Sequence, residues 1–140
     1  MATVSIPRSA VRTLLYAEST NAGRNFERGD GVSEFEKVLV DKMEDESLTG
    51  SWYEACSKLE EKMHDFITGY TLNNMQAQYI FMATSVPDGV ADNIKMFIVN
   101  YMMAEWMASV RPDSRQRYVD RCNIQMDDLL RKLYKKEPPV

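Results

Sequence analysis

Apolar residues recur at helical spacing from near the start of the 140-residue chain. Ser5-Ile6-Pro7 is typical of a helix start, because proline is tolerated in the first turn and presets the backbone angle there. The spacing predicts a helix from these residues to about Thr20, where Asn21-Ala22-Gly23 ends it. Gly29-Asp30-Gly31 follows with a strong turn signal and no periodicity, which predicts an exposed loop.

Two serine–glutamate pairs predict further helix starts. Ser33 with Glu36, and Ser51 with Glu54, match the capping box, in which the two side chains bind exposed backbone donors at a helix start. Gly50 either separates two helices or weakens one long helix by roughly 1 kcal/mol relative to alanine. The second start precedes one apolar stripe, which consists of Trp52, Cys56, Leu59, Met63, Phe66 and Ile67.

The helical period fails between residues 69 and 87. Alternating apolar positions favour a strand there, with a loop as the alternative. Residues 68–71 supply a partner strand, and Asn73-Asn74 stands in the turn between the two. The pattern therefore predicts a small β-hairpin between the second and third main helices. Because an isolated hairpin is marginal in water, it should lie against the helices or pair with a strand of another chain.

The third main helix is apolar on nearly every side. Asp88 or Asp92 caps its start, and it should run to about Val110. A helix that is apolar all round must be covered all round. We therefore expect a central helix that is packed by the others, with any remainder facing a second subunit.

The fourth main helix follows Pro112, which ends the third. Asp113 with Gln116 forms another capping pair at its start. Its predicted buried stripe consists of Val119, Cys122, Met126, Leu129, Leu130 and Leu133.

These elements predict a mainly α fold, a four-to-five-helix bundle with the small hairpin added. A chain of 140 residues is the common size of one domain. We place that single helical domain at residues 1–133 and an extended C-terminal tail at 134–140. The tail's prolines deny it helical hydrogen bonds, and its lysines are costly to bury without partners. The tail should therefore serve assembly and contribute little to the fold.

Composition and charge exclude several classes of protein. The chain is 44% hydrophobic and 27% charged, which is ordinary for a globular protein and disfavours disorder. The apolar stretch at 96–108 is interrupted by Asn100 and Glu105 and is shorter than the ~20 residues that cross a bilayer, so we expect no membrane role. No positively charged start followed by an apolar run opens the chain, so we expect no signal peptide. The pI near 5.1 disfavours nucleic-acid binding. Cys56 and Cys122 should be free thiols in a reducing compartment.

The net charge of −4 is unevenly distributed. Residues 27–65 hold twelve acids and five bases, whereas residues 93–140 hold nine bases and six acids. Complementary patches of this kind steer head-to-tail contact between copies. Two solvated helix faces are the alternative interpretation.

No residue pattern predicts catalysis, a cofactor or a metal. His64 is the only histidine, and its acidic neighbours Glu60, Glu61 and Asp65 are typical of a solvated helix face. The glycines do not have the spacing of a phosphate-binding loop. We expect a protein that is not an enzyme and that binds no cofactor.

Candidate partner-binding residues are aromatic or lie in the tail. Large aromatic side chains often anchor interfaces, although at helical spacing they more often belong to the core. An extended end has little to gain inside its own domain, so it is either disordered or lies on a neighbour. The candidates are Tyr101, Trp106, Tyr134, Lys135, Lys136, Pro138 and Pro139.

Four segments together resemble the small helical head-tail connector (adaptor) proteins of tailed bacteriophages and prophages. They are Ser5-Ile6-Pro7, the helix with Trp52 to Cys56, Tyr101 to Trp106 followed by Pro112, and the end from Leu129 to Val140. The resemblance covers most of the chain and is a pattern without a signature motif.

The resemblance implies a virion protein, made in the host bacterial cytoplasm, that forms a homo-oligomeric ring below the portal. Portal and tail proteins are the implied partners, and DNA passes through the ring only as cargo. It implies no catalytic residues. The hairpin departs from the simplest all-helical version of the family. A small helical protein-binding or regulatory module, monomeric or dimeric, is the alternative function.

Overall fold

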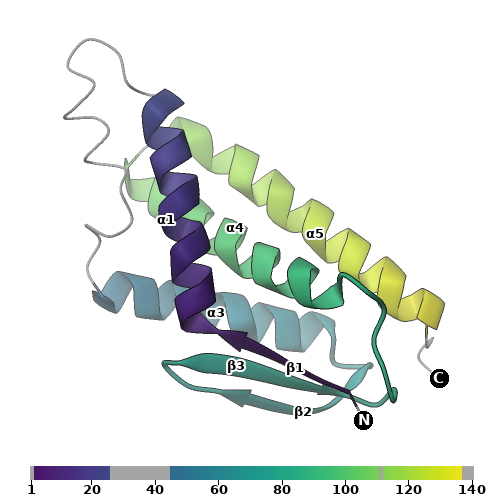
Figure 1. Cartoon of the computed structure of the whole chain (residues 1–140). Coiled ribbons are helices and arrows are strands. Elements are labelled where there is room, and N and C mark those ends of the chain that lie inside the picture. The colour runs from purple at the N-terminus through teal and green to yellow at the C-terminus, as the bar shows by residue number, and fades with distance from the viewer. Residues whose placement is uncertain (1, 26–44, 111, 137–140) are drawn as a thin grey trace.

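The computed structural model describes residues 2–25, 45–110 and 112–136. This part of the chain is mainly helical, with four α-helices and one small antiparallel sheet (Figure 1). In chain order the elements are β1 (Ala2–Pro7), α1 (Arg8–Asn25), α3 (Asp45–Lys62), β2 (Ile67–Leu72), β3 (Gln76–Phe81), α4 (Val90–Val110), a 3-10 turn η2 (Pro112–Ser114) and α5 (Arg115–Lys136). The prediction of a mainly α fold is confirmed, whereas the bundle remains a prediction.

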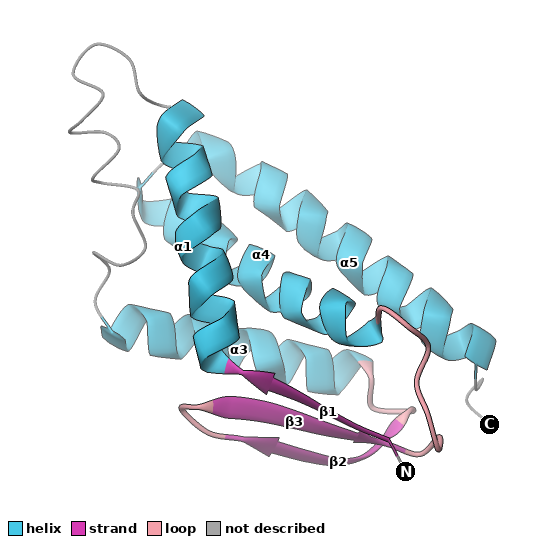
Figure 2. Cartoon of the chain, viewed as in Figure 1, coloured by secondary structure: helices cyan, strands magenta, loops and turns pink. Residues whose placement is uncertain are grey.

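The predicted hairpin is present as β2 and β3. Its turn is closed by Asn73, whose side-chain oxygen accepts hydrogen bonds from the backbone N–H groups of Met75 at 2.7 Å and Gln76 at 2.9 Å. A third strand, β1, pairs antiparallel with the other side of β3, so the strand order is β1-β3-β2. Figure 2 shows this sheet at one end of the molecule, beside the helices. One face is buried, through Val4, Ile6, Ala77, Tyr79 and Phe81.

The predicted helix start at Ser5-Ile6-Pro7 is wrong. These residues end β1, and α1 begins one residue later, at Arg8. Val4 and Ile6 alternate with exposed neighbours, which is the strand period, and proline is tolerated at the end of an edge strand. The partner strand begins 69 residues after Pro7, at Gln76, so local spacing carried no sign of it. Helix α1 also continues beyond Thr20 to Asn25.

The predicted helix start at Ser51 is also wrong. Helix α3 begins at Asp45 and passes through Gly50 and Ser51 without a break. The stripe predicted from this segment is buried, through Trp52, Cys56 and Leu59 on the helix and Met63, Phe66 and Ile67 beyond it. The other proposed start, at Ser33, lies outside the described residues, as does the loop at residues 29–31.

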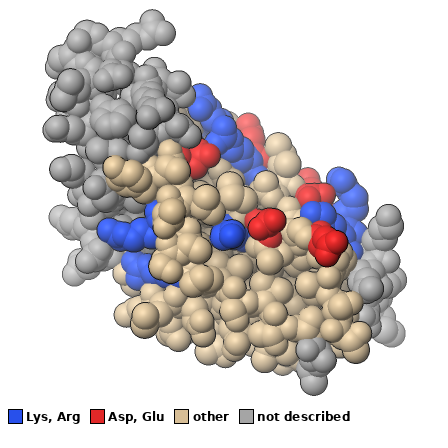
Figure 3. All heavy atoms as spheres, viewed as in Figure 1, with Lys and Arg blue, Asp and Glu red and all other residues tan. Residues whose placement is uncertain are grey.

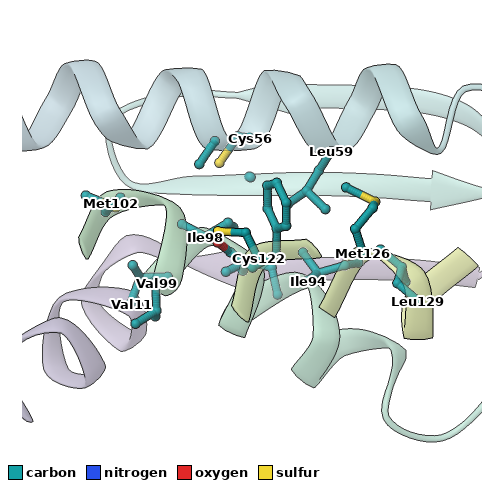
Figure 4. Close-up of a cluster of buried hydrophobic side chains, with 14 of the residues drawn as sticks. Val11, Cys56, Leu59, Ile94, Ile98, Val99, Met102, Cys122, Met126 and Leu129 are labelled. Atoms are coloured by element: carbon teal, nitrogen blue, oxygen red, sulfur yellow. Dashed lines mark hydrogen bonds between the residues drawn. The ribbon is translucent and has the colours of Figure 1, made fainter. Parts of the chain in front are cut away.

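Helix α4 is the centre of the protein. It contacts α5, α3, α1 and β1, so elements of its own chain cover most of its apolar surface. Figure 4 shows side chains from α3 and α5 converging on Ile94 and Ile98 of α4. The predicted central helix is confirmed, and its fully or nearly buried apolar residues are Val90, Ile94, Phe97, Ile98, Val99, Met102, Met103, Ala104, Trp106 and Met107.

A polar cluster joins the start of α4 to α5. The buried Asn93 donates to Gln125 at 2.8 Å and to the Asp128 carboxylate at 3.1 Å. Lys132 donates to the Asn93 side-chain oxygen at 2.7 Å and forms an ion pair with Asp128 at 3.0 Å. The hydrogen bonds from Lys132 and Asn93 hold the pKa of Asp128 below its usual value. Every one of these side-chain partners of Asn93 comes from α5, which fixes the register of the two helices.

The hairpin turn is attached to the helices by three side chains. Trp52 of α3 donates from its indole nitrogen to the Asn73 carbonyl at 2.9 Å. Tyr53 donates to the Asn74 side chain at 2.6 Å, and Arg8 donates to the Asn74 carbonyl at 3.3 Å. These bonds hold the sheet against α3 and the start of α1.

Two glycine substitutions should have opposite effects on stability. Gly89 has a φ of +89°, and a Cβ there would lie 2.8 Å from the Lys132 ammonium nitrogen. Gly89→Ala should therefore cost roughly 1–2 kcal/mol, because alanine is strained at positive φ and the Lys132 ammonium group must shift. Gly50→Ala, in a helix with nothing within 4 Å of the new Cβ, should stabilise by about 0.5–1 kcal/mol. Urea unfolding measures both, and an unchanged midpoint for Gly89→Ala would contradict this account.

Candidate interaction surfaces

Trp106 is not available as a surface anchor in the single chain. Its side chain is only 5% exposed and belongs to the core around α4. The helical spacing of the apolar residues in this segment favours a core position for a large aromatic side chain. Of the aromatic partner-binding candidates, only Tyr101 and Tyr134 therefore reach the surface.

Tyr101 lies half-buried on the side of α4 between α3 and α5. Its hydroxyl donates to the Glu54 carboxylate at 3.3 Å, and its ring lies 6.0 Å from that of Phe97. Burial, reinforced by the negative charges of Glu54 and Glu105, raises its pKa to about 12. Tyr101 is therefore a neutral hydrogen-bond donor at physiological pH.

A groove of about 370 Å³ lies between α3, α4 and α5, and Tyr101 lines it. We call this surface the α3-α4-α5 groove. Its rim carries Lys58 and Lys62 from α3, Glu105 from α4 and Arg115 from α5. Its floor is apolar and consists of Phe97, Tyr101, Ala104, Val119, Cys122 and Met126.

Of the C-terminal candidates for partner binding, only Tyr134 has a described side chain. The predicted tail boundary after Leu133 is wrong, because α5 continues through Tyr134 to Lys136. The Tyr134 ring meets the Phe66 ring edge to face at 5.0 Å, so packing extends beyond Leu133. The side chains of Lys135 and Lys136 are not described, and Pro138 and Pro139 lie outside the described residues.

The sheet carries no charged residue. Residues 2–7 and 66–87, which include all three strands and the segments around them, contain no Asp, Glu, Lys, Arg or His. In Figure 3 the charged side chains gather over the helices, and the surface over the sheet is nearly free of them. Two methionines at the ends of β3 add exposed apolar area, Met75 at 78% and Met82 at 50% exposure. We call this surface the uncharged sheet.

The uncharged sheet could have been found in the sequence. The charged fraction of the whole chain is 27%, so a run of 22 residues without charge, at 66–87, stands out from the rest of the chain. The α3-α4-α5 groove had no such signal, because it depends on how three helices pack. Sequence reasoning found one of its floor residues as a site candidate, Tyr101, and missed the cations of its rim.

The chemistry of the remaining candidates is modest. Cys56 and Cys122 are free and buried, as predicted, and burial raises the pKa of each thiol to about 12, so both are protonated and poorly nucleophilic at neutral pH. His64 is exposed. Within the described ranges, no group of three or more His, Cys, Asp and Glu residues could hold a metal ion. None of the helices described here is long and apolar enough to cross a membrane.

No protein-family model matches this chain, and comparisons with curated proteins and with solved structures also found no match.

Tyr134→Ala should lower the free energy of unfolding by about 1 kcal/mol, because edge-to-face aromatic pairs contribute roughly 0.5–1.5 kcal/mol beyond their buried area. Urea unfolding of Tyr134→Ala, Phe66→Leu and the double variant measures the coupling between the two rings. Ile124→Ala is the control on the same helix, since Ile124 is 65% exposed and should change stability little. Additive effects of the two substitutions would mean that the ring contact adds no stability.

Proposed function

We propose that the protein is a virion structural protein, a head-tail connector (adaptor) subunit that forms a ring of identical copies below the portal. The observation that carries the proposal is the uncharged sheet, whose two edge strands lack the usual protection against pairing with another chain. The resemblance to connector proteins supplies the biological setting.

The edges offer backbone groups for pairing. The Arg8 N–H points toward β3, because it donates to the Met75 carbonyl. In an antiparallel pair, successive residues point their N–H and C=O groups alternately toward the partner strand and away from it. Those of Thr3 and Ser5 therefore lie on the outer side of β1. At the other edge, the Asn73 N–H donates to the Gln76 carbonyl, so Tyr70 and Leu72 carry the outward groups of β2. No strand of the described chain lies beyond either edge.

Monomeric proteins usually block such edges with charged side chains, proline, bulges or covering segments. None of the three strands carries a charge. Pro7 stands only at the last position of β1, and the irregularity in β2 lies only at its start, between Ile67 and Gly69. The centre of each edge strand therefore carries no charge, proline or bulge that would block a strand from another chain.

The two edges favour head-to-tail contact. Both β1 and β2 run antiparallel to β3, so they run parallel to each other. If β2 of one copy pairs with β1 of the next, each copy uses two different patches, and a contact of this kind generates a closed ring when the rotation between copies closes. Uncharged faces also approach each other without the cost of desolvating ions.

The proposal includes the partners that the resemblance implies. Portal and tail proteins bind the two sides of the ring, DNA crosses it only as cargo, and the protein resides in the virion after synthesis in the host bacterial cytoplasm. We propose no catalytic activity and no cofactor. The prolines Pro138 and Pro139 and the lysines before them remain candidates for contact with a neighbouring subunit.

A small protein-binding or regulatory module is the second candidate function. The α3-α4-α5 groove favours it, because concave apolar surfaces with a few polar groups are the usual form of binding sites. This function would need no self-assembly, so the oligomeric state in the presence of portal protein separates the two candidates.

Thr3→Pro should prevent ring formation and leave the fold intact. The Thr3 N–H lies on the outer side of β1 and its side chain is exposed, so proline removes an outward donor without removing a bond to β3. One lost hydrogen bond of roughly 1 kcal/mol recurs at every interface of a ring. Co-purification with portal protein and electron microscopy of the complex measure assembly, and thermal unfolding measures the fold.

Thr3→Val is the matched control, because it keeps the backbone donor and the branched side chain. The control should assemble as wild type does. Rings of Thr3→Pro at wild-type yield would show that this edge does not pair. A wild-type protein that neither binds portal nor forms rings would contradict the connector function itself.

A further inference from the structure

The α3-α4-α5 groove has an excess of positive charge at its rim. Lys58 and Lys62 stand on one wall and Arg115 on the other, against the carboxylate of Glu105 at the rim and that of Glu54, which accepts the hydrogen bond from Tyr101. All five charged side chains are exposed. Within the described residues, none of the three cations takes part in an ion pair or a hydrogen bond. The groove thus presents three cations that have no anionic partner among the described residues.

The floor between these cations is apolar. Phe97, Cys122 and Met126 are nearly buried, and they form a base that is already packed against the core. Tyr101 and Val119 are half-buried and still have apolar surface to offer. Methionine adapts its shape to the group that contacts it, which suits a surface that receives a partner.

We propose that this groove binds an amphipathic helix of a partner protein, with carboxylates along the flanks of its apolar face. Apolar side chains spaced at i, i+3 or i+4 and i+7 would lie on the floor, as in other helix-in-groove complexes. The flanking carboxylates would meet Lys58 and Lys62 on one side and Arg115 on the other. Charge complementarity selects this partner over a basic helix, which would place like charges together at both walls.

The inference is independent of the ring. The groove is formed by α3, α4 and α5, whereas the proposed contact between copies uses β1 and β2. A variant of the groove should therefore lose the helical partner and keep self-assembly. A connector and a regulatory module could both use such a site.

The test uses two fluorescein-labelled helical peptides with the same leucine positions, one with glutamate and one with lysine at the flanking positions. Fluorescence anisotropy measures their binding to the full chain. The acidic peptide should bind, and the Lys58→Glu/Lys62→Glu variant should bind it about tenfold more weakly, because charge reversal turns attraction into repulsion. The basic peptide should show the opposite change. Both effects should diminish at high salt.

Arg117→Glu/Arg131→Glu is the matched control. It makes the same change in net charge at exposed positions of α5 that do not line the groove, and its binding of the acidic peptide should stay within about twofold of wild type. Equal losses in both variants would overturn the proposal, because net charge alone would then explain binding. Equal binding of the acidic and basic peptides by the wild type would also overturn it.

Sedimentation of the protein alone addresses a different occupant. If the wild type self-associates and Lys58→Glu/Lys62→Glu abolishes that association, a second copy fills the groove and the proposed partner is wrong. Retained self-association, with loss of the peptide, supports a separate helical partner.

Discussion

The rest of the structure depends on covering the apolar surface of α4. Of its 21 residues, the buried polar ones are Asn93 and Asn100, and apolar side chains fill the remaining buried positions. Burial of apolar surface contributes roughly 25 cal/mol per Å², and a domain this small has only one core in which to gain it. Helices α1, α3 and α5 and strand β1 therefore all lie against α4.

The two candidate surfaces are consequences of that cover. Helices α3 and α5 lie on α4 from different sides, and the α3-α4-α5 groove is the place where they leave its surface incompletely covered. One face of the sheet packs against the core around α4. The other face and both edge strands are not covered by any other strand of the described chain. The two candidate surfaces also differ in charge, because the groove carries cations at its rim and the sheet carries no charged residue.

Local sequence patterns predicted the elements whose signals are local. The hairpin was predicted because Asn73-Asn74 and alternating apolar residues stand next to each other, and α4 because its apolar residues are continuous. Strand β1 was missed because its partner is distant in sequence, and Pro7 serves a strand end as well as a helix start. The boundary at Leu133 failed because Tyr134 packs on Phe66, a contact between the end of α5 and the segment that joins α3 to β2. The groove could not be predicted because no single helix contains it. The uncharged sheet could have been predicted from residues 66–87 alone.

Native-state hydrogen exchange of the monomeric protein tests the central role of α4 most directly. If α4 is the buried centre of the protein, its amides from Ile94 to Met107 exchange only when the whole protein unfolds. Their exchange free energies should then equal the free energy of unfolding measured in denaturant, and those of α1 and of the two edge strands should be lower. Exchange of α4 at a lower free energy than α1 or α5 would contradict the account, because it would show that the central helix opens before the elements that cover it.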